Sequence, residues 1–355
     1  MSAPASPDPD SPFEWIIDTH YRQKAQGTED CARLALLGTL GPDGDGAAVA
    51  LRPWLAEQGV PPDELTVELA YEYLQDIRDA YSPRTQQTRA LYAAKAYELL
   101  VRQQINGFEY NPIASVLEDH PNLFDEITQT SATVYRKDVL KNVVEQQHPV
   151  DMTVSMTLLK TARRVSSVVN LDFYDVHLDH PAADWPVHPL LRDKPDHLHF
   201  GPGVSAGEIH RGEVRTDGVA TNTRVAVPMD AELKAFLVWY LSFRRAVDHD
   251  GAFFINPRGV AEAERLTSAV YRNWLTPIVK SQGLFYEAND PDNIRPQYWR
   301  YWTTTKMRER INNTVVEYFR GDKSATSDDY THYTAHKARQ WRKHIPKFYR
   351  SPSPP

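Results

Sequence analysis

The chain has 355 residues, of which 41% are hydrophobic and 25% are charged, a composition typical of globular proteins, and its length predicts two domains. Cys31 is the single cysteine, which excludes an intramolecular disulfide and a zinc or iron–sulfur site built on cysteines. No run of about 18 apolar residues occurs, so we expect no membrane-spanning helix and no membrane partner. The first residues lack the pattern of a signal peptide, and the expected compartment is the cytoplasm.

Charge is distributed unevenly along the chain. The 40 Lys/Arg and 47 Asp/Glu residues give a net charge of −7. Residues 300–350 alone hold 12 Lys/Arg and five Asp/Glu, a net +7, so the rest of the chain totals −14. A basic segment on an acidic body can bind phosphate locally. The alternative interpretation is a solvated basic helix near the C-terminus.

Changes in composition divide the chain into five segments. Both ends are rich in Pro and Ser, which predicts disorder. The segments are a disordered tail over 1–12, a helical domain over 13–118, a linker over 119–133, an α+β domain over 134–350 and a second disordered tail over 351–355.

Helical patterns fill the first domain. One amphipathic stretch ends at Gly59, and a second, over 65–80, has apolar residues at helical spacing. Ser82 and Pro83 predict the start of a long helix that ends near Ile105, because Ser favours the N-cap and Pro the first helical turn.

The second domain mixes helices with short strands. Residues 151–170 predict one mostly buried helix, and the sequence LDFYDVHL that follows predicts a short strand. Short β-like runs over 198–228, interrupted by Gly, predict a small antiparallel sheet. Further helices are predicted over 230–246, 264–282, 297–319 and 335–347. The predicted fold class is mostly α with a small antiparallel β-sheet.

Common cofactor and hydrolase motifs are absent from the sequence. It contains no P-loop, no H-E-x-x-H and no G-x-S-x-G. The glycine-rich run over 41–46 lacks the ligands of a calcium loop and predicts a turn. Six histidines between His177 and His210 are spaced irregularly, which favours polar strand and loop positions over a metal site. We predict no metal and no other cofactor.

Three clusters carry the residues best suited to chemistry. In the first, Arg163 and Arg164 lie on an otherwise apolar predicted helix, and a buried guanidinium needs an anionic partner. In the second, Gln297 and Arg300 share a helix face among aromatic residues. In the third, Tyr330 stands among polar residues. Taken singly, the three clusters are also compatible with a structural ion pair, an aromatic core helix and a surface tyrosine, respectively.

In their order and spacing the clusters resemble the tyrosine recombinase (phage-integrase) family, and more closely its branch in salt-loving archaea. The segment KTARR over 160–164 resembles the family's K-T-G-x-R, which implies that Arg164 is the first catalytic arginine. The segment RPQYWRY resembles T-P-H-x-x-R-H, which implies that Arg300 is the second, with Gln297 at the histidine position. The segments YFRGD and YTH resemble Y-L-R-G-D and Y-T-H, which implies that Asp322 belongs to the site and that Tyr330 is the nucleophile. Tyr333 is the alternative nucleophile.

The resemblance implies a helical core-binding domain followed by a catalytic domain, the two closing around double-stranded DNA. Two planar guanidiniums can clamp the non-bridging phosphate oxygens while a tyrosine forms a 3′-phosphotyrosyl link, without metal or cofactor. The implied assembly is a homotetramer on DNA, with a monomer in solution left open. Candidate DNA-contacting residues are Arg84, Thr85, Arg89, Lys137, Arg224 and Arg320.

The sequence departs from the family pattern at groups that move protons. No lysine lies between Lys194 and Lys234, where the family has a general acid, and Arg224 is a poor proton donor. Gln297 cannot shuttle protons. The leading hypothesis is a site-specific DNA recombinase or integrase. The alternatives are a catalytically degenerate homologue that binds specific DNA sequences, and an unrelated helical interaction protein. Docking of the C-terminal helix on its own chain or on a neighbour is left open.

Overall fold

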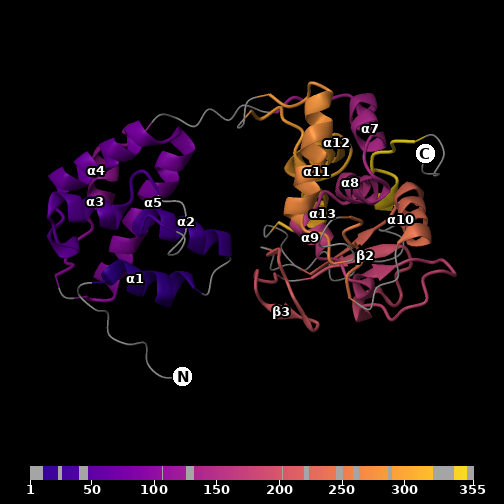
Figure 1. The fold of residues 1–355 in the computed structure, drawn as a ribbon, viewed down its shortest axis with the longest axis horizontal. Helices are drawn as coiled ribbons and strands as arrows, with labels where there is room; N and C mark the ends of the chain where they lie inside the picture. The colour runs from indigo at the N-terminus through magenta and orange to yellow at the C-terminus, as the bar shows by residue number, and fades with distance from the viewer. Residues whose placement is uncertain are drawn as a thin grey trace. The chain divides into compact units, whose positions relative to one another are not determined.

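Helices dominate the computed structural model, and the fold class predicted from the sequence, mostly α with a small antiparallel sheet, is confirmed (Figure 1). The chain divides into two compact units, Met1–Gln129 and Thr130–Pro355. The predicted tails lie outside the described residues, apart from positions 11 and 12. The structure describes residues 11–22, 26–39, 47–105, 107–124, 132–201, 203–219, 224–244, 251–258, 264–286, 290–322 and 340–349.

The first unit is a helical domain around one apolar core. Phe13, Trp54, Tyr73 and Tyr97 are among the aromatic side chains buried in that core. Its helices are α1 (Pro12–Ile16), which continues into a π-helical turn (Ile17–Tyr21), α2 (Gln26–Leu36), α3 (Leu51–Gln58), α4 (Val67–Ala80), α5 (Pro83–Arg102) and α6 (Pro112–Asp119).

Local sequence explains where these helices begin and end. Gly59 ends α3 with φ +66°, a left-handed conformation that glycine adopts without steric cost. The Thr66 hydroxyl accepts a hydrogen bond from the Leu69 amide at the start of α4. Pro83 occupies the first turn of α5, as predicted, although the Ser82 side chain makes no capping bond to the backbone.

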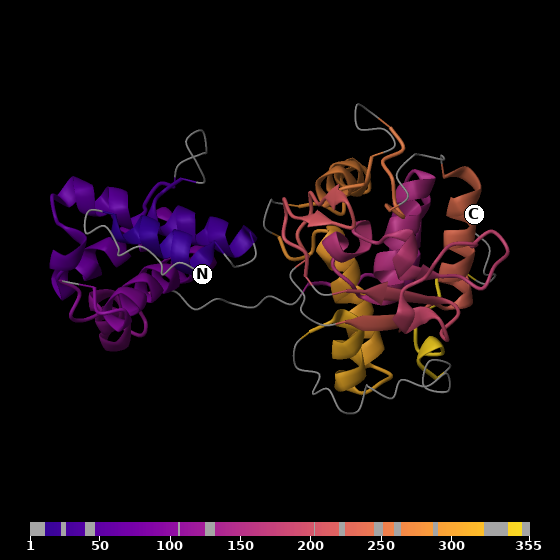
Figure 2. The same cartoon turned by 90° about the horizontal axis from the view of Figure 1, so that it is seen from below.

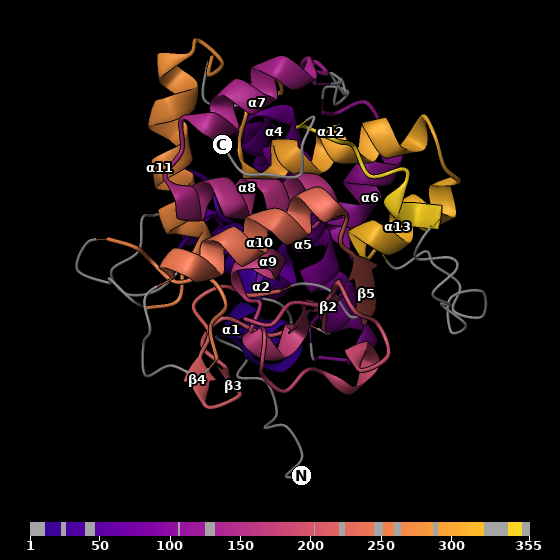
Figure 3. The ribbon, with the colours of Figure 1, turned by 90° about the vertical axis from the view of Figure 1, so that its right-hand side faces the viewer.

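The second unit surrounds α8 with helices. Figure 3 shows α8 between α7 and α10, and α11 and α12 also pack against it. Every residue of α8 after its first is buried, and Val154, Leu158 and Leu159 lie in the core with Trp299 of α12. The helices are α7 (Lys137–Glu145), α8 (Pro149–Thr161), α9 (Val165–Val169), α10 (Ala231–Phe243), α11 (Ser268–Ser281), α12 (Pro296–Arg308) and α13 (Asn313–Arg320).

A three-stranded antiparallel sheet lies against these helices (Figure 2). Its order is β1-β2-β5, and Leu198 of β2 pairs with Val176 on one side and Val227 on the other. A separate hairpin of β3 and β4 lies at the periphery of the unit (Figure 3). The strands are β1 (Val176–His177), β2 (His197–Phe200), β3 (Ile209–His210), β4 (Glu213–Val214) and β5 (Val225–Pro228).

Three predicted elements differ from the structure. The helix predicted over 151–170 breaks at Ala162, whose φ of +54° ends α8 before α9 begins. The helix predicted over 297–319 is two helices, because Asn312 caps the start of α13 by accepting from the Thr314 amide. In the predicted strand LDFYDVHL, Phe173–Asp175 form a 3₁₀ turn, and only Val176–His177 pair in the sheet.

Two further segments belong to the second unit. Residues 132–133, predicted as linker, accept hydrogen bonds from the hydroxyls of Tyr301 and Tyr298 of α12, both at 2.6 Å. Residues 340–349 pack on their own chain, where Trp341 and Phe348 enter the core. Only the end of the predicted helix over 335–347 is described. Within the described ranges, no helix has the length and apolarity needed to cross a membrane.

Candidate phosphate-binding site

Arg300 lies in the middle of α12 and is 2% exposed. Its guanidinium donates hydrogen bonds to the carbonyl oxygens of Ala162 (3.1 Å) and Arg320 (2.9 Å) and to Oδ1 of Asp322 (2.7 Å). These contacts join α12 to the break after α8 and to the end of α13. Burial is the main cause that lowers the pKa of Arg300 to about 10, and the charges of Arg320 and Arg164 add to it. Arg300 remains fully cationic at neutral pH.

Arg164 is the N-cap residue of α9, and its side chain is half-buried. The left-handed Ala162 ends α8, and its carbonyl accepts from Arg300 at 3.1 Å, so the backbone two residues before Arg164 lies against the Arg300 guanidinium. Within the part of the chain that the structure describes, the Arg164 guanidinium makes no hydrogen bond or ion pair. Two arginines from distant segments therefore lie close together, and one of them has unused donors.

Asp322 is the carboxylate of this cluster. Its Oδ1 accepts from Arg300, and its Oδ2 lies 2.8 Å from Nε of Arg320. Gly321, immediately before it, has φ +70°, and a Cβ there would lie 1.9 Å from Nη1 of Arg163. The side chain of Asp322 is 26% exposed, so this carboxylate reaches solvent beside Arg300.

Gln297 is exposed on the first turn of α12, one helical turn before Arg300, and makes no hydrogen bond among the residues described. The hydroxyl of Tyr301, at the position of the family's second histidine, donates to the Ala132 carbonyl and so serves packing. Tyr330 and Tyr333 lie outside the described residues. The structure therefore describes four of the five expected catalytic residues: Arg164, Gln297, Arg300 and Asp322.

Most of the expected DNA-contacting residues are accessible. Exposure is full or partial for Arg84, Thr85, Lys137, Arg224 and Arg320.

Arg89 differs from this group. It is buried, lies over the ring of Tyr81 at 4.4 Å, and donates to the carbonyl oxygens of Leu34 and Val49. Arg89 is therefore buried within the first unit, and its expected contact with DNA stays a prediction.

Lys160 is also structural. Its ammonium is fully buried and donates to Asp230 (2.7 Å), to the Pro346 carbonyl (2.6 Å) and to Glu232. Glu232 accepts in turn from the Phe348 amide at 3.0 Å. This lysine therefore ties α8 to the start of α10 and to residues 340–349.

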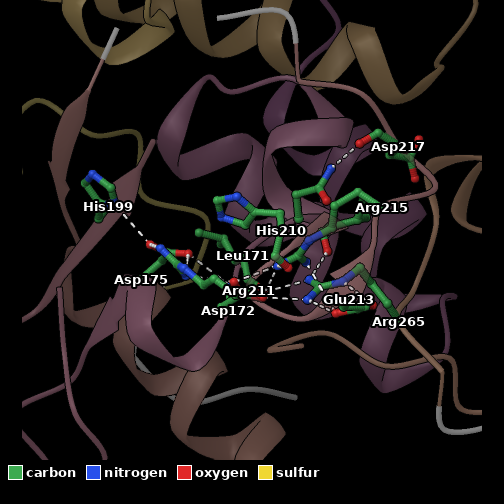
Figure 4. A network of polar contacts seen from close by, with 12 residues as sticks. Leu171, Asp172, Asp175, His199, His210, Arg211, Glu213, Arg215, Asp217 and Arg265 are labelled. Carbon is green, nitrogen blue, oxygen red and sulfur yellow. Dashed lines mark hydrogen bonds and ion pairs between the residues drawn. The ribbon is translucent and has the colours of Figure 1, made fainter. Parts of the chain in front are cut away.

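A network of buried ions lies beside α9 (Figure 4). Asp172, 1% exposed, pairs with Arg211 (2.7 Å), Arg215 (2.8 Å) and Arg265 (2.5 Å). Arg211 also pairs with Asp175 at 2.8 Å. These contacts anchor the β3–β4 hairpin to the start of β1. Sequence reasoning missed the network, because its members are up to 93 residues apart and no local motif marks them.

The same region contains a cavity of about 250 Å³. His199 contacts Asp175 through Nδ1 at 2.9 Å and stacks on His188 with ring centroids 3.7 Å apart. Ser167 of α9 and Arg224 also line the cavity. Across the described ranges, no group of three or more His, Cys, Asp or Glu side chains is arranged to hold a metal ion.

Comparison with known proteins supports a fold assignment. No protein-family model and no curated sequence matches the chain. Among solved structures, the Tn1549 transposon integrase in complex with transposon right end DNA matches with a TM-score of 0.62 and 15% identity, over 94% of this chain and 98% of that one. A lambda integrase dimer bound to a COC′ core site matches with a TM-score of 0.59 and 12% identity, over 90% and 96%.

A lambda integrase tetramer bound to a Holliday junction matches with a TM-score of 0.58 and 13% identity, over 90% of this chain and 78% of that one. At these identities the similarity shows the fold alone. The chain has the fold of these integrases, and its structural neighbours include several integrase–DNA complexes.

Proposed function

We propose that this chain, having the fold of these integrases, is a site-specific DNA recombinase of the tyrosine type. The observation that carries the proposal is the hydrogen bond that Arg300 donates to the Ala162 carbonyl at 3.1 Å, two residues before Arg164, although Arg164 and Arg300 are 136 residues apart in the sequence. Two guanidiniums side by side form a cationic clamp suited to the non-bridging oxygens of a phosphodiester. The resemblance to the salt-loving archaeal branch, together with the acidic body of the chain, suggests that the protein acts in concentrated salt.

In the proposed reaction the Tyr330 hydroxyl attacks a DNA phosphorus atom. The bond from phosphorus to the 5′-oxygen breaks as the bond to the tyrosine oxygen forms, and the 5′-hydroxyl leaves. The 3′-phosphotyrosyl link keeps the phosphodiester energy for rejoining, so the reaction needs no external energy source. Arg164 and Arg300 stabilise the charge that develops on the phosphate oxygens.

Protonation of the leaving 5′-oxygen is the weak step of this scheme. Gln297 and Arg224 stand where the family has groups that exchange protons, and neither exchanges them near neutral pH. General acid–base groups typically contribute about 10² to 10⁴-fold each. We therefore expect slow cleavage, with water accepting the proton of the Tyr330 hydroxyl and donating a proton to the leaving 5′-oxygen.

The proposed partner is double-stranded DNA, with phosphate contacts from the exposed or partly exposed Arg84, Thr85, Lys137, Arg224 and Arg320. The lambda integrase structures are a dimer on a core site and a tetramer on a Holliday junction, and we propose a homotetramer on DNA for this chain by analogy.

A second candidate function is sequence-specific DNA binding without cleavage. One observation favours it: Asp322 pairs with Arg300 at 2.7 Å and so occupies donors that a phosphate would use. If the Asp322–Arg300 pair persists on DNA, the remaining cations still bind phosphate. The transition state of cleavage, however, is no longer stabilised by Arg300.

A covalent-trapping assay distinguishes the two functions. Purified protein in molar potassium chloride is incubated with nicked duplexes that cover the flanks of its own gene, and denaturing gels reveal adducts. An adduct that disappears in Arg300→Ala and persists in Arg272→Ala, a change at an exposed arginine of α11, supports the recombinase. Specific binding without an adduct supports the second candidate, and absence of binding contradicts both.

A further inference from the structure

Arg163 has no role in the resemblance, yet it is among the most buried large side chains of the chain, with 1% exposure. Its Nε and Nη2 atoms are buried and have no hydrogen-bond partner. Within the described ranges, no carboxylate lies within ion-pair distance of it. Its guanidinium stacks on the ring of Phe200 at 4.4 Å from the centroid.

Stacking on Phe200 leaves the N–H donors of Arg163 without hydrogen-bond acceptors. A ring face attracts the flat side of a guanidinium, whereas its N–H donors point outward in the guanidinium plane. A buried cation with unused donors is costly unless an anion compensates it. Removal from water is the largest of the causes that lower the pKa of Arg163 to about 9, and the neighbouring charge of Arg300 is the second. The group still carries its charge at neutral pH.

Arg163 lies at the same two backbone segments as Arg300. Arg300 donates to the carbonyls of Ala162 and Arg320, which directly precede Arg163 and Gly321. Nη1 of Arg163 lies so close to Gly321 that even a methyl group there would collide with it. The glycine thus leaves room for a guanidinium beside the clamp.

The cluster carries an excess of positive charge. Arg163, Arg164, Arg300 and Arg320 contribute four charges, and Asp322 is the carboxylate paired within the cluster among the residues described. An excess of three charges in a partly buried site is suited to a polyanionic group.

We propose that Arg163 is a third guanidinium of the phosphate site, and that a phosphoryl group of the ligand, rather than a protein carboxylate, compensates its charge. The inference rests on the proposed function for the identity of that ligand as DNA. A phosphate ion in solution offers the same chemistry, and the experiment separates the two sources. Arg163 adds a positive charge to the site, but it does not supply the proton that the family's lysine, absent between Lys194 and Lys234, would donate.

The test measures thermal unfolding and DNA binding of Arg163→Met, with Arg272→Met as a matched surface control. Inorganic phosphate, titrated at constant potassium chloride, is the first ligand. We expect it to raise the unfolding midpoint of the wild type and of the control, and to bind the Arg163→Met protein about tenfold or more weakly, because one charge-assisted contact is lost. Without ligand, Arg163→Met is expected to unfold at or above the wild-type temperature.

A lower midpoint for Arg163→Met together with an unchanged phosphate response would overturn the proposal, since stacking on Phe200 would then be the whole role of Arg163. If Arg163→Met does not fold, Arg163→Lys serves as the test variant in its place. This variant keeps the positive charge and loses the planar guanidinium that can donate two parallel hydrogen bonds. We expect the lysine variant to fold and to bind phosphate several-fold more weakly, and an unchanged affinity would overturn the proposal.

Duplex DNA is the second ligand, and it separates this inference from the proposed function. If phosphate raises the unfolding midpoint of the wild-type protein and the protein binds no DNA, the proposed function is wrong and the proposed phosphate site is supported. If wild type binds DNA and Arg163→Met binds it equally at every salt concentration, the inference fails and the proposed function stands. A DNA affinity lowered in Arg163→Met, with a weaker salt dependence, supports both.

Discussion

Asp172→Asn removes the centre of the buried ion network and tests whether that network holds the second unit together. Asp172 is 1% exposed and pairs with three arginines. After its loss, Arg211 keeps Asp175 at 2.8 Å and Arg265 keeps Glu213 at 2.7 Å. Arg215, 1% exposed, keeps only Glu213 at 3.6 Å as an ion-pair partner among the residues described.

The expected loss of folding free energy comes from Arg215, because Arg211 and Arg265 keep close carboxylate partners and Arg215 does not. Removing one partner of a buried ion pair destabilises a protein by about 3–5 kcal/mol, because the remaining charge is left unpaired. At about 2–4 °C per kcal/mol for a unit of this size, the unfolding midpoint should fall by about 6–20 °C.

Calorimetry and urea unfolding, followed by near-ultraviolet circular dichroism, measure the change. The matched control is Asp193→Asn, whose carboxylate is 80% exposed beside Lys194 and whose loss should cost within about 0.5 kcal/mol. If Asp172→Asn costs no more than this control, the network is not what stabilises the hairpin, and the reasoning is wrong.

Three further predictions concern single buried groups. Burial raises the pKa of Asp151 to about 7 against the charge of Arg258, so its contribution to stability is present below an unfolded pKa near 3.8 and is lost as pH rises through 7. The stability of wild type minus that of Asp151→Asn should therefore fall as pH rises from 3.8 to about 7 and then level off in denaturant titrations, and a flat difference would contradict this. Gly321→Ala should cost about 1–2 kcal/mol from its positive φ alone, and more while Arg163 is present. Unfolding of the double variant Gly321→Ala/Arg163→Ala checks this prediction, since the additional destabilisation caused by the collision with Arg163 should disappear. Lys160→Met should destabilise by about 3–5 kcal/mol and make residues 340–349 sensitive to protease, whereas wild-type resistance would refute its tying role.

The sequence predicts the fold class because periodicity and local turn chemistry suffice for it. Pro83 after Ser82 marks the start of α5, and the apolar runs around Leu198 and Val227 form the paired strands β2 and β5. The break at Ala162 was not predictable in this way, because a left-handed alanine has no local cause in the sequence and is held by packing.

The residues of the candidate site also fall into two groups, those that motif order identifies and those whose surroundings only the structure reveals. Arg164 and Arg300 are recognisable from motif order, and the structure places Arg300 in contact with the Ala162 carbonyl, two residues before Arg164. Arg89, chosen as a surface cation, is buried because carbonyls 55 and 40 residues away accept its donors. The unpaired state of Arg163 likewise depends on which groups surround it, and charge counting along the chain does not reveal that.

Mass spectrometry of the trapped protein–DNA adduct tests the central claim most directly. After digestion with nuclease and trypsin, the account predicts a nucleotide attached through a 3′-phosphate to Tyr330, and no modified peptide from Arg300→Ala protein. Attachment at Tyr333 would move the nucleophile by three residues. A protein that binds its DNA site specifically and yields no nucleotide–tyrosine peptide would contradict recombinase chemistry and identify a DNA-binding protein on an integrase fold.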